Sequence, residues 1–485
     1  MDLTEHGDLP RVWTVLGAET GLLEGIRYER GDGPGLPARL PVMELARTSV
    51  AAAALAAAEL AAVRAGGPAP RVRVSDGAVA AAFVSERLVR LDGRAWAAFD
   101  PLSRFWRTGD GRLRTHANYP HHRARLLAAL GLPDGAPVAA VAAVLGGRRA
   151  VEVEEAVYAA GGLAVAVRDV RQWAAHPQGA LVPGRPPLTL ERSDGPGRRP
   201  VPFPAAGTPA RPCAGLRVLD LTRVLAGPVA TRTLALLGAE VLRLDSPHLP
   251  ESQEAHNDTG PGKRSAVLDL ASRAGRRTFD ELLAGADVVV SGYRPGALDR
   301  FGLSPAELAA RRPGLVVARL SAWGRYGPWR GRRGFDSLVQ AATGIALLEG
   351  TDSEPGALPA QALDHGTGYL LAAGVLRALT ERHRDGRGAL VEAALTETAH
   401  WLVHDLGRDG TTGPDGPADP DGPADPGGPA DPGGPANRDR WTSTVDGPLG
   451  RLRYARSPVA YEGGPADWTR PPGRWGTDAP AWSGD

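Results

Sequence analysis

Between Gly215 and Gly324 the sequence alternates short apolar runs with helix-like or turn-like segments, and this alternation restricts the fold more than any other feature. The apolar runs are GLRVLDLT (215–222), AEVLRLD (239–245), SAVLDL (265–270), ADVVVSG (286–292) and GLVVARLSAWG (314–324). Near-continuous apolar strands separated by helices are typical of a parallel sheet that has helices on both faces. We therefore expect an α/β fold with a doubly wound, Rossmann-like parallel sheet.

Two segments rich in Pro and Gly divide the chain around this sheet. Residues 183–212 have no apolar periodicity and are predicted to be a linker. Residues 406–440 contain the near-hexad repeat GPDGPADPDGPADPGGPADPGGPAN (413–437), which cannot bury apolar surface and is predicted to be disordered. This division leaves an N-terminal region (1–182), a sheet domain (213–405) and a C-terminal tail (441–485).

Composition excludes several classes of protein. Fifty-six basic residues balance 55 acidic ones, so the chain has no broad positive field for nucleic acid. The one cysteine, Cys213, excludes an internal disulfide framework, and the N-terminus lacks a secretory pattern; both favour a cytoplasmic protein. The Ala-rich run 49–63 is short and contains Glu59, so we expect no membrane span.

Ligands of such sheets bind beyond the carboxyl ends of the strands, so the turns there are candidate sites. The first turn, RVLAGPVA (223–230), lacks the G-x-G-x-x-G glycines, which disfavours a dinucleotide. Later turns carry cations and an aromatic ring, which together suit a phosphorylated ligand. These residues are Lys263, the single lysine of the chain, Arg264, Tyr293, Arg294, Arg300, Arg332 and Arg333.

Asp364 stands immediately before a helix with an apolar stripe, and two interpretations are open. By sequence alone it is best interpreted as an N-cap. Alternatively, the helix N-terminus favours a functional carboxylate, with Gly366 and Gly368 leaving room for a substrate. The histidines of RTHANYPHHR (114–123) match no metal-binding pattern, so we expect surface histidines and no metal site.

Taken in order, GLRVLDLTRVLAGPVATRTLALLGAEVLRLDSP, GKRSAVLDL, ADVVVSGYRPGALDRFGL, GFDSLVQAATG and ALDHGTGYLLAAGVLRALTERHRDGRG resemble the family III CoA-transferases (CaiB/BaiF-type). That family includes formyl-CoA transferase and α-methylacyl-CoA racemase. The resemblance covers about residues 215–402. It implies a second, smaller α+β domain, with coenzyme A or acyl-CoA as a substrate and no tightly bound cofactor.

The resemblance also assigns site residues. Val224, Leu225 and Ala226 would line the CoA site, and Lys263, Tyr293, Arg300 and Arg333 would lie near its nucleotide end. Asp336 matches an acidic position of the transferases and is included in the CoA-contacting set. Asp364 matches the nucleophilic aspartate, which forms an anhydride with the acyl group and then a thioester with CoA. Backbone N–H groups at Gly366 to Gly368 would stabilise the oxyanions.

The order of the domains departs from that of the family. The N-terminal region resembles the latter part of one copy of the family's chain, which begins with the aspartate helix and includes the smaller domain. The rest of the chain then resembles the first part of a second copy. Residues 47–74 align with residues 366–393 without a gap at a spacing of 319 positions, and Leu45 stands where the second copy has Asp364. Two similar Ala-rich helices without common origin remain an alternative interpretation of this alignment.

The predicted function is transfer of CoA between an acyl-CoA and a carboxylic acid. One alternative is a racemase or isomerase of the same family, but Phe335 stands where the racemases have a histidine, and it cannot exchange a proton. The other alternative is a degenerate, non-catalytic CoA-binding protein. From the family's interlocking subunits we expect a homodimer.

Overall fold

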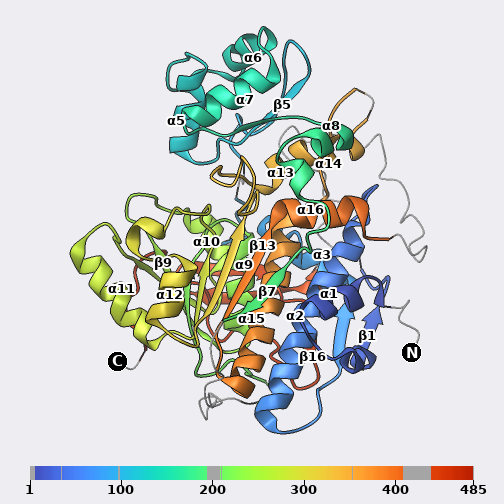
Figure 1. The fold of residues 1–485 in the computed structure, drawn as a ribbon, viewed down its shortest axis with the longest axis vertical. Coiled ribbons are helices and arrows are strands. Elements are labelled where there is room, and N and C mark those ends of the chain that lie inside the picture. Colours follow the sequence, from blue (N-terminus) through green and yellow to red (C-terminus); the bar gives the residue numbers. More distant parts are fainter. Residues whose placement is uncertain are drawn as a thin grey trace.

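The computed structural model describes residues 6–33, 35–96, 99–193, 208, 210–351, 353–407 and 439–483. The predicted disordered repeat and part of the predicted linker therefore lie outside the described residues. Figure 1 shows a central sheet with helices on both sides and a smaller unit standing above it.

The central sheet has seven strands, and neighbouring strands follow the order β10-β9-β8-β11-β12-β13-β7. The first six pair in parallel, in the order of a doubly wound sheet with its crossover point between β8 and β11. Their bounds are β8 (Arg217–Leu221), β9 (Glu240–Asp245), β10 (Lys263–Val267), β11 (Val288–Ser291), β12 (Val316–Ser321) and β13 (Ala389–Ala394). The predicted α/β fold with a mostly parallel sheet is confirmed.

Alternate residues of these strands enter two different cores. Val288 and Val290 pack into a large core with α9 (Ala226–Leu236), α15 (Ala362–Asp385) and α16 (Leu395–His404). Val289, between them, packs on the other face with α11 (Arg273–Gly285) and α12 (Pro305–Arg311). This two-sided burial explains why the strands are almost continuously apolar.

The predicted linker contains an unexpected strand. β7 (Thr189–Arg192) pairs antiparallel with β13 and forms the edge of the sheet, so the boundaries 183–212 do not describe a linker alone. Only four residues long, β7 lies beside Pro-rich sequence, which hides its apolar pattern. Cys213, which directly follows the predicted linker, is fully buried in the large core.

The N-terminal region is divided between two cores. Its first part packs into the large core through α1 (Leu9–Val15), β1 (Ile26–Glu29), α2 (Val42–Ala65), β2 (Val72–Ser75), α3 (Asp76–Ala82) and α4 (Ser85–Leu88). Its second part has a core of its own, with antiparallel strands β4 (Phe105–Arg107), β5 (Arg112–Thr115) and β6 (Ala164–Ala166). We call this second part the small domain.

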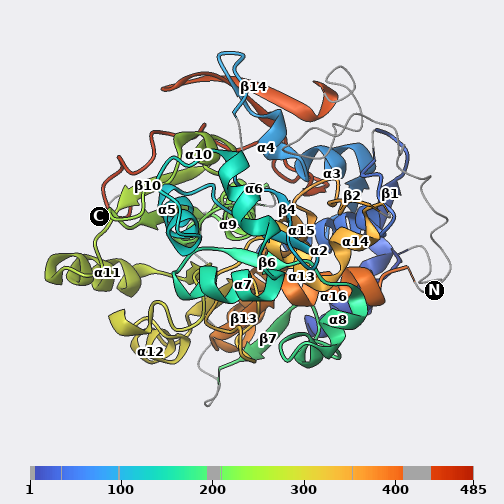
Figure 2. The ribbon, with the colours of Figure 1, turned by 90° about the horizontal axis from the view of Figure 1, so that it is seen from above.

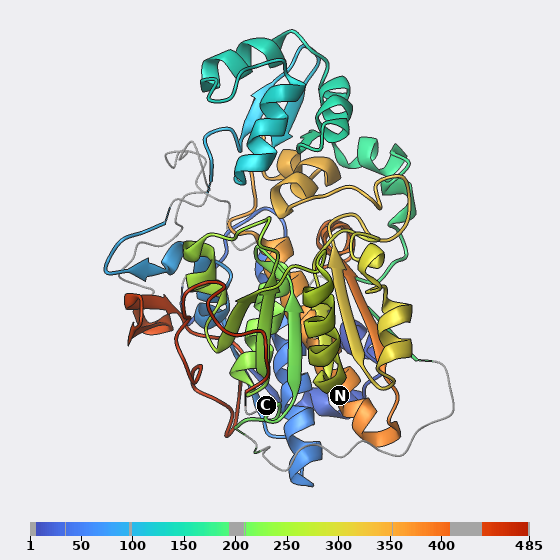
Figure 3. The same ribbon diagram turned by 90° about the vertical axis from the view of Figure 1, so that its left-hand side faces the viewer.

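Helices α5 (Pro120–Ala129), α6 (Val138–Gly146) and α7 (Ala150–Ala159) complete the small domain. It stands above the sheet in Figures 1 and 3, and seen from above α13 (Asp336–Thr343) lies beneath β6 (Figure 2). The backbone N–H of Arg168 donates to the carbonyl of Ala341 in α13, which ties the two units together. The remaining helices at this junction are α8 (Val170–Ala175) and α14 (Ile345–Leu348).

The two aligned sequence segments have the same local structure. In each segment, a 24-residue helix (α2 or α15) ends at a glycine with positive φ, and a strand (β2 or β13) and another helix follow. These following helices begin at Asp76 and at Leu395, which are 319 positions apart. The strands before them also correspond, because β1 pairs in parallel with β2 as β12 does with β13. The long helices α2 and α15 pack against each other, so the two segments face one another across the core.

Helix α2 extends well beyond the Ala-rich run. Among the described residues it is the one helix long and apolar enough to cross a membrane, yet 89% of its most apolar window is buried inside the protein. Burial of this kind is also found in the central helices of soluble proteins, so the feature is weak support for a membrane span.

The last described segment is anchored to the main fold. Strands β14 (Thr442–Gly447) and β15 (Gly450–Ala455) form a small sheet with β3 (Arg90–Leu91), and β16 (Ala460–Tyr461) pairs with β2. Beyond them, the indole N–H of Trp475 donates to Asp245, and that of Trp468 donates to the carbonyl of Arg232. The predicted tail therefore packs against α9 and the end of β9.

Candidate active site

The turn between β8 and α9 has a strained backbone. Val224 adopts φ 71°, a left-handed conformation that is a genuine outlier for a β-branched residue. Such strain persists only where the surroundings impose it, and it is found most often at functional sites. Val224 and Leu225 are half-buried and Ala226 is the first residue of α9, so this turn presents backbone near the crossover point of the sheet.

Two glycines of α15 allow other elements to approach. A Cβ at Gly368 would lie 2.5 Å from the carbonyl oxygen of Ala226, and one at Gly366 would lie 3.2 Å from Leu45. These glycines therefore serve close helix packing, and the expectation that they leave room for a substrate is wrong. The expected oxyanion donors at Gly366 to Gly368 are also wrong, because inside a helix their N–H groups bond the carbonyls four residues earlier.

Asp364 is not the N-cap of α15. The N-cap position is Gln361, no side-chain capping bond forms, and Asp364 lies in the first turn. Its side chain is buried, with the residue 6% exposed. Within the described part of the chain, no residue donates a hydrogen bond to its carboxylate. The backbone N–H of Asp364 instead donates to Oδ2 of Asp336, at 3.0 Å.

Asp336 holds the backbone of Asp364 in place through this hydrogen bond. It is fully buried at the start of α13, and its other carboxylate oxygen accepts a bond from the side-chain amide of Gln340. Because both oxygens are used inside the protein, the assignment of Asp336 to the CoA-contacting set is wrong. Its carboxylate fixes the turn that carries Asp364.

The two carboxyl groups cannot both be ionised at low cost. Burial, followed by the carboxylates of Asp336 and Glu86, raises the pKa of Asp364 well above its usual range. Burial also raises the pKa of Asp336, to about 6. Perturbed carboxyls of this kind gather at reactive sites, and here the more perturbed of the two is Asp364.

The structure does not place Lys263 at a ligand site. Its side chain is fully buried, and its Nζ bonds Oδ2 of Asp220 at 3.0 Å, Oγ1 of Thr231 at 2.6 Å and the carbonyl of Pro228 at 3.0 Å. Burial lowers the pKa of Lys263 to about 8. With its donors used internally, Lys263 cannot contact a phosphate, and that assignment is wrong. It instead ties β10 to β8 and α9.

A group of cations gathers between the small domain and the sheet domain. Burial and the charges of Arg294 and Arg125 lower the pKa of the Arg333 guanidinium. In the part of the chain that is described, no carboxylate lies within 4.0 Å of any of these three side chains, and the one hydrogen bond that they make there joins Arg125 to the carbonyl of Gly161. Three mutually repelling guanidinium groups without a counter-charge form a site suited to a polyanion.

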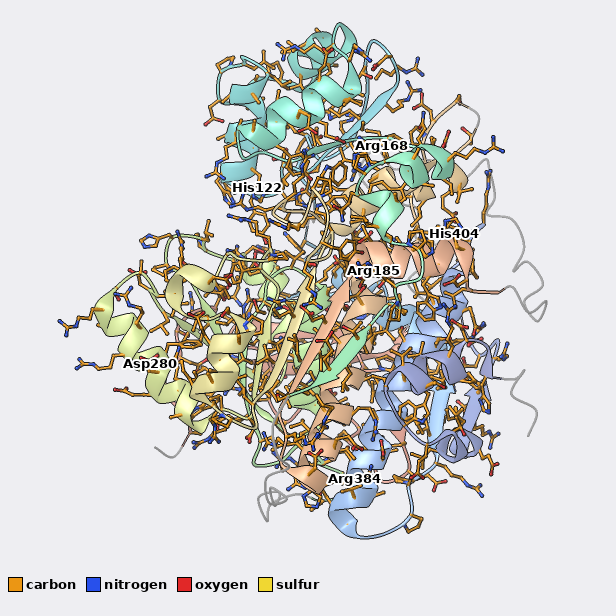
Figure 4. The ribbon with its side chains drawn as sticks, in the orientation of Figure 1. His122, Arg168, Arg185, Asp280, Arg384 and His404 are labelled. Carbon is orange, nitrogen blue, oxygen red and sulfur yellow. The ribbon has the colours of Figure 1, made fainter. Side chains whose placement is uncertain are left out.

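The neighbouring histidines are buried, so the expectation of surface histidines is wrong for two of them. His116 stacks on Phe335 with ring centroids 3.7 Å apart, and His122 is 4% exposed with neither ring nitrogen bonded. Burial lowers the pKa of His116 to about 3 and that of His122 to about 2, so both are neutral. Figure 4 shows His122 at the base of the small domain, on the side facing the sheet domain.

A second contact joins the small domain to the turn after β8. The Tyr119 hydroxyl donates to Glu251 at 2.9 Å, and the Arg223 guanidinium lies over the Tyr119 ring. Glu251 also pairs with Arg223 and with the buried Arg243. Arg223, unlike the three free cations, is thus already neutralised.

Of the other predicted residues, Tyr293 lies in a cavity at the carboxyl ends of β11, β12 and β13, together with Arg294 and Ser321. Arg300 is exposed and packs over the Phe301 ring. The structure therefore brings together Val224, Leu225 and Ala226 with the helix of Asp364, and places Arg333 with Arg294. It gives Arg300 no contact with either group.

Several residues near Asp364 were not found from the sequence. Glu86, which pairs with His365, comes from a segment whose proximity only the folded chain reveals, and so does Arg125, which lies near Arg333; His365 itself directly follows Asp364 in the sequence. The one available signal was the alignment of residues 47–74 with 366–393, which places the N-terminal region beside α15.

A comparison with protein families identifies part of the chain. The model of CoA-transferase family III matches residues 213–430. This segment is therefore similar to CoA-transferase family III. The resemblance drawn from the sequence motifs is confirmed for this segment.

Curated relatives of this family III segment are named as CoA-transferases. The succinyl-CoA–L-malate CoA-transferase alpha subunit of Chloroflexus aurantiacus is 31% identical over 46% of this chain and 56% of its own. The formyl-CoA:oxalate CoA-transferase of Streptomyces coelicolor is 35% identical, over 38% of this chain and 48% of its own. The acetyl-coenzyme A transferase nodX of Hypoxylon pulicicidum is 36% identical, over 42% and 35%. The chain thus spans about a third to somewhat over half of these relatives.

Solved structures of the family match the same share. A crystal structure of Rv3272 from Mycobacterium tuberculosis is 36% identical, over 40% of this chain and 56% of its own, with a TM-score of 0.38. A CaiB/BaiF family protein from Brucella suis is 31% identical over the same shares, with the same TM-score. Both matches cover only part of each chain.

Proposed function

We propose that the protein transfers CoA between an acyl-CoA and a carboxylic acid, with Asp364 as the covalent nucleophile. The observation that carries this proposal is the position of Asp364 in the first turn of α15. Asp364 is buried, and no described residue donates a hydrogen bond to its carboxylate. One helical turn further along α15, Gly368 contacts the carbonyl of Ala226, two residues after the strained Val224. A structural cap would use its oxygens, whereas a nucleophile needs one free.

The reaction follows from a carboxylate in such a site. A carboxylate oxygen of Asp364 attacks the thioester carbonyl, the C–S bond breaks, and a mixed anhydride and CoA thiolate result. The thiolate attacks the aspartyl carbonyl, releasing the donor acid and leaving an aspartyl-CoA thioester. An acceptor carboxylate then displaces the thiolate from that thioester. The thiolate finally attacks the acceptor's carbonyl and frees Asp364.

The cations at Arg125, Arg294 and Arg333 support binding of the CoA phosphates. Their charges have no counter-ion among the described residues, and the cavity containing Tyr293 lies next to Arg294. The two free ring nitrogens of His122 supply neutral hydrogen-bonding groups beside them. We infer that CoA lies across the junction of the sheet domain and the small domain.

The alternatives receive less support. A racemase needs a base with a pKa near the working pH, and the histidines that surround Phe335 have pKa values of about 3 and about 2. A degenerate CoA-binding protein does not need a buried carboxyl pair, which destabilises the fold. Homodimer formation and a cytoplasmic location remain proposals that rest on the resemblance and on composition.

The deciding experiment incubates the purified protein with a panel of acyl-CoAs and carboxylic acids and measures new acyl-CoAs by mass spectrometry. Asp364→Asn keeps volume and charge-neutral hydrogen bonding, so folding should change little, but turnover should fall by at least about 1,000-fold because the covalent route is lost. Hydroxylamine added to the wild type with acyl-CoA should trap a hydroxamate on the Asp364 peptide. Normal turnover by Asp364→Asn would show that Asp364 is structural.

A further inference from the structure

A buried Glu–His pair lies directly beside Asp364 and has no part in the mechanism above. Oε2 of Glu86, in α4, is 3.2 Å from Nε2 of His365, in α15. His365 is fully buried and Glu86 is 8% exposed. The pair joins two segments that are 279 residues apart and meets the helix at the residue after Asp364.

The surroundings hold both members of the pair in place. The Phe83 ring stacks on His365 with centroids 5.3 Å apart. Next to Glu86, the Ser85 hydroxyl donates to Asp258 at 3.0 Å and accepts a bond from Arg232. Arg232 and Asp258 also form a buried ion pair at 3.1 Å, which anchors α4 to α9 and α10 (Gln253–Thr259).

The charged groups around Asp364 come from three elements. Glu86, with Arg87 3.9 Å away, comes from α4, Asp336 comes from α13, and His365 lies on α15 itself. The Arg232–Asp258 pair lies farther along, beside Tyr369. Three carboxyls thus lie in one buried space, and the imidazole of His365 pairs with Glu86 alone, so ionisation of any one carboxyl opposes ionisation of the others.

We propose that Glu86 is a positioning residue of this site: its hydrogen bond to His365 holds its carboxylate beside the turn of α15 that carries Asp364, where its negative charge acts on Asp364. The proposal rests on the proposed function, because it takes Asp364 as the group whose ionisation matters. The Glu86 carboxylate sets the pH above which Asp364 loses its proton and can attack a thioester. The N-terminal segment thereby controls a nucleophile that lies in the family III segment.

The test follows the infrared band of the protonated Asp364 carboxyl as a function of pH. The band is assigned as the one lost in Asp364→Asn. Glu86→Gln keeps the volume and the hydrogen bond to His365 but removes the negative charge, so the midpoint of the band should move to lower pH. His365→Gln leaves the Glu86 charge without its imidazole, so the midpoint should move to higher pH.

Glu59→Gln is the matched control. Glu59 is also a buried carboxylate of the N-terminal region, and it pairs with Arg377 of α15 at 2.6 Å. Arg377 lies thirteen residues after Asp364, about 20 Å along the helix. Glu59→Gln should leave the midpoint unchanged. An unshifted midpoint in both Glu86→Gln and His365→Gln, or equal shifts in Glu86→Gln and Glu59→Gln, would overturn the proposal.

The band reports on Asp364 without turnover, so failure of the proposed function is separable from failure of this inference. If no acyl-CoA and acid pair reacts but the midpoints move as expected, only the transferase activity is contradicted. If transfer is found, the acid limb of its kcat/KM profile should move to lower pH in Glu86→Gln, together with the band.

Discussion

At the scale of single residues, charges in this protein divide into those that are satisfied internally and those that are not. Lys263, Arg232 and Arg243 are buried cations, each paired with a carboxylate. Arg125, Arg294 and Arg333 are exposed cations that face one another without a carboxylate among the described residues. Buried pairs of the first kind stabilise the fold only as pairs, whereas the second kind is available to a ligand.

Lys263 provides a test of this division. Lys263→Met preserves most of the side-chain volume but leaves Asp220 buried without its cation, so the free energy of unfolding should fall by about 3–5 kcal/mol. CoA affinity of the folded protein should not change. Urea denaturation measures the first quantity and calorimetry at low temperature the second. Asp220→Asn in the Lys263→Met background should restore part of the stability, whereas tenfold weaker CoA binding without lost stability would return Lys263 to the ligand site.

The sequence could not separate these two kinds of residue. Lys263 and Arg333 both follow the motif pattern of the family, and only burial shows that one is internal and the other free. Asp364 was found because its motif is local, lying within one helix turn. Glu86 and Arg125 were missed because no local pattern distinguishes a buried or ligand-facing charge from one in solvent.

At the scale of elements, the site depends on how closely three helices approach. α15 contacts α9 through Gly368 and α2 through Gly366, and the strained turn at Val224 begins the first of these contacts. The strands of the sheet were predictable because two-sided burial makes them continuously apolar. The roles of the two glycines were not, since their neighbours lie 142 and 321 positions away in the sequence.

The two glycines should respond differently to the same substitution. At Gly368 a methyl group would meet the backbone oxygen of Ala226 at 2.5 Å, so Gly368→Ala should displace the turn at Val224 and cost about 1–3 kcal/mol of stability as well as CoA affinity. At Gly366 it would meet the movable side chain of Leu45 at 3.2 Å, so Gly366→Ala should have a smaller effect. Thermal unfolding and calorimetry compare the two. Equal losses would show that the turn and α2 are equally adaptable.

At the scale of the whole molecule, the chain contains two versions of one helix–strand–helix unit, and only one carries the proposed nucleophile. In the N-terminal version Leu45 replaces Asp364, and the position of Gly366 is taken by Arg47, which is buried in a two-bond ion pair with Asp76. The Arg47 side chain fills the space at that place, and Asp76 neutralises its charge. The N-terminal unit thus packs against α15, and α4, which follows it, lies beside the residue after Asp364.

This arrangement predicts where the parts of one site come from. In the proposed site, CoA held by Arg125 of the small domain reaches Asp364 of the same chain, so each chain should be complete by itself whether or not the expected homodimer forms. Arg125→Glu, an exposed charge reversal, should weaken CoA binding at least about tenfold. Asp364→Asn should bind CoA but not transfer it. Light scattering of each variant measures whether it forms a dimer, which is the condition for exchanging subunits between the two.

Mixing the two variants under conditions of subunit exchange, and assaying them at an acyl-CoA concentration too low for Arg125→Glu to turn over, then decides the origin of the site. Within one chain, every site in the mixture carries one defect, so no transfer should return. If Arg125 instead served the partner's Asp364, a hybrid dimer would contain one site with both residues intact, and up to about a quarter of wild-type activity would return at equal mixing because half of the dimers are hybrids. Recovered transfer would therefore mean that the small domain reaches across a dimer to the Asp364 of the partner subunit.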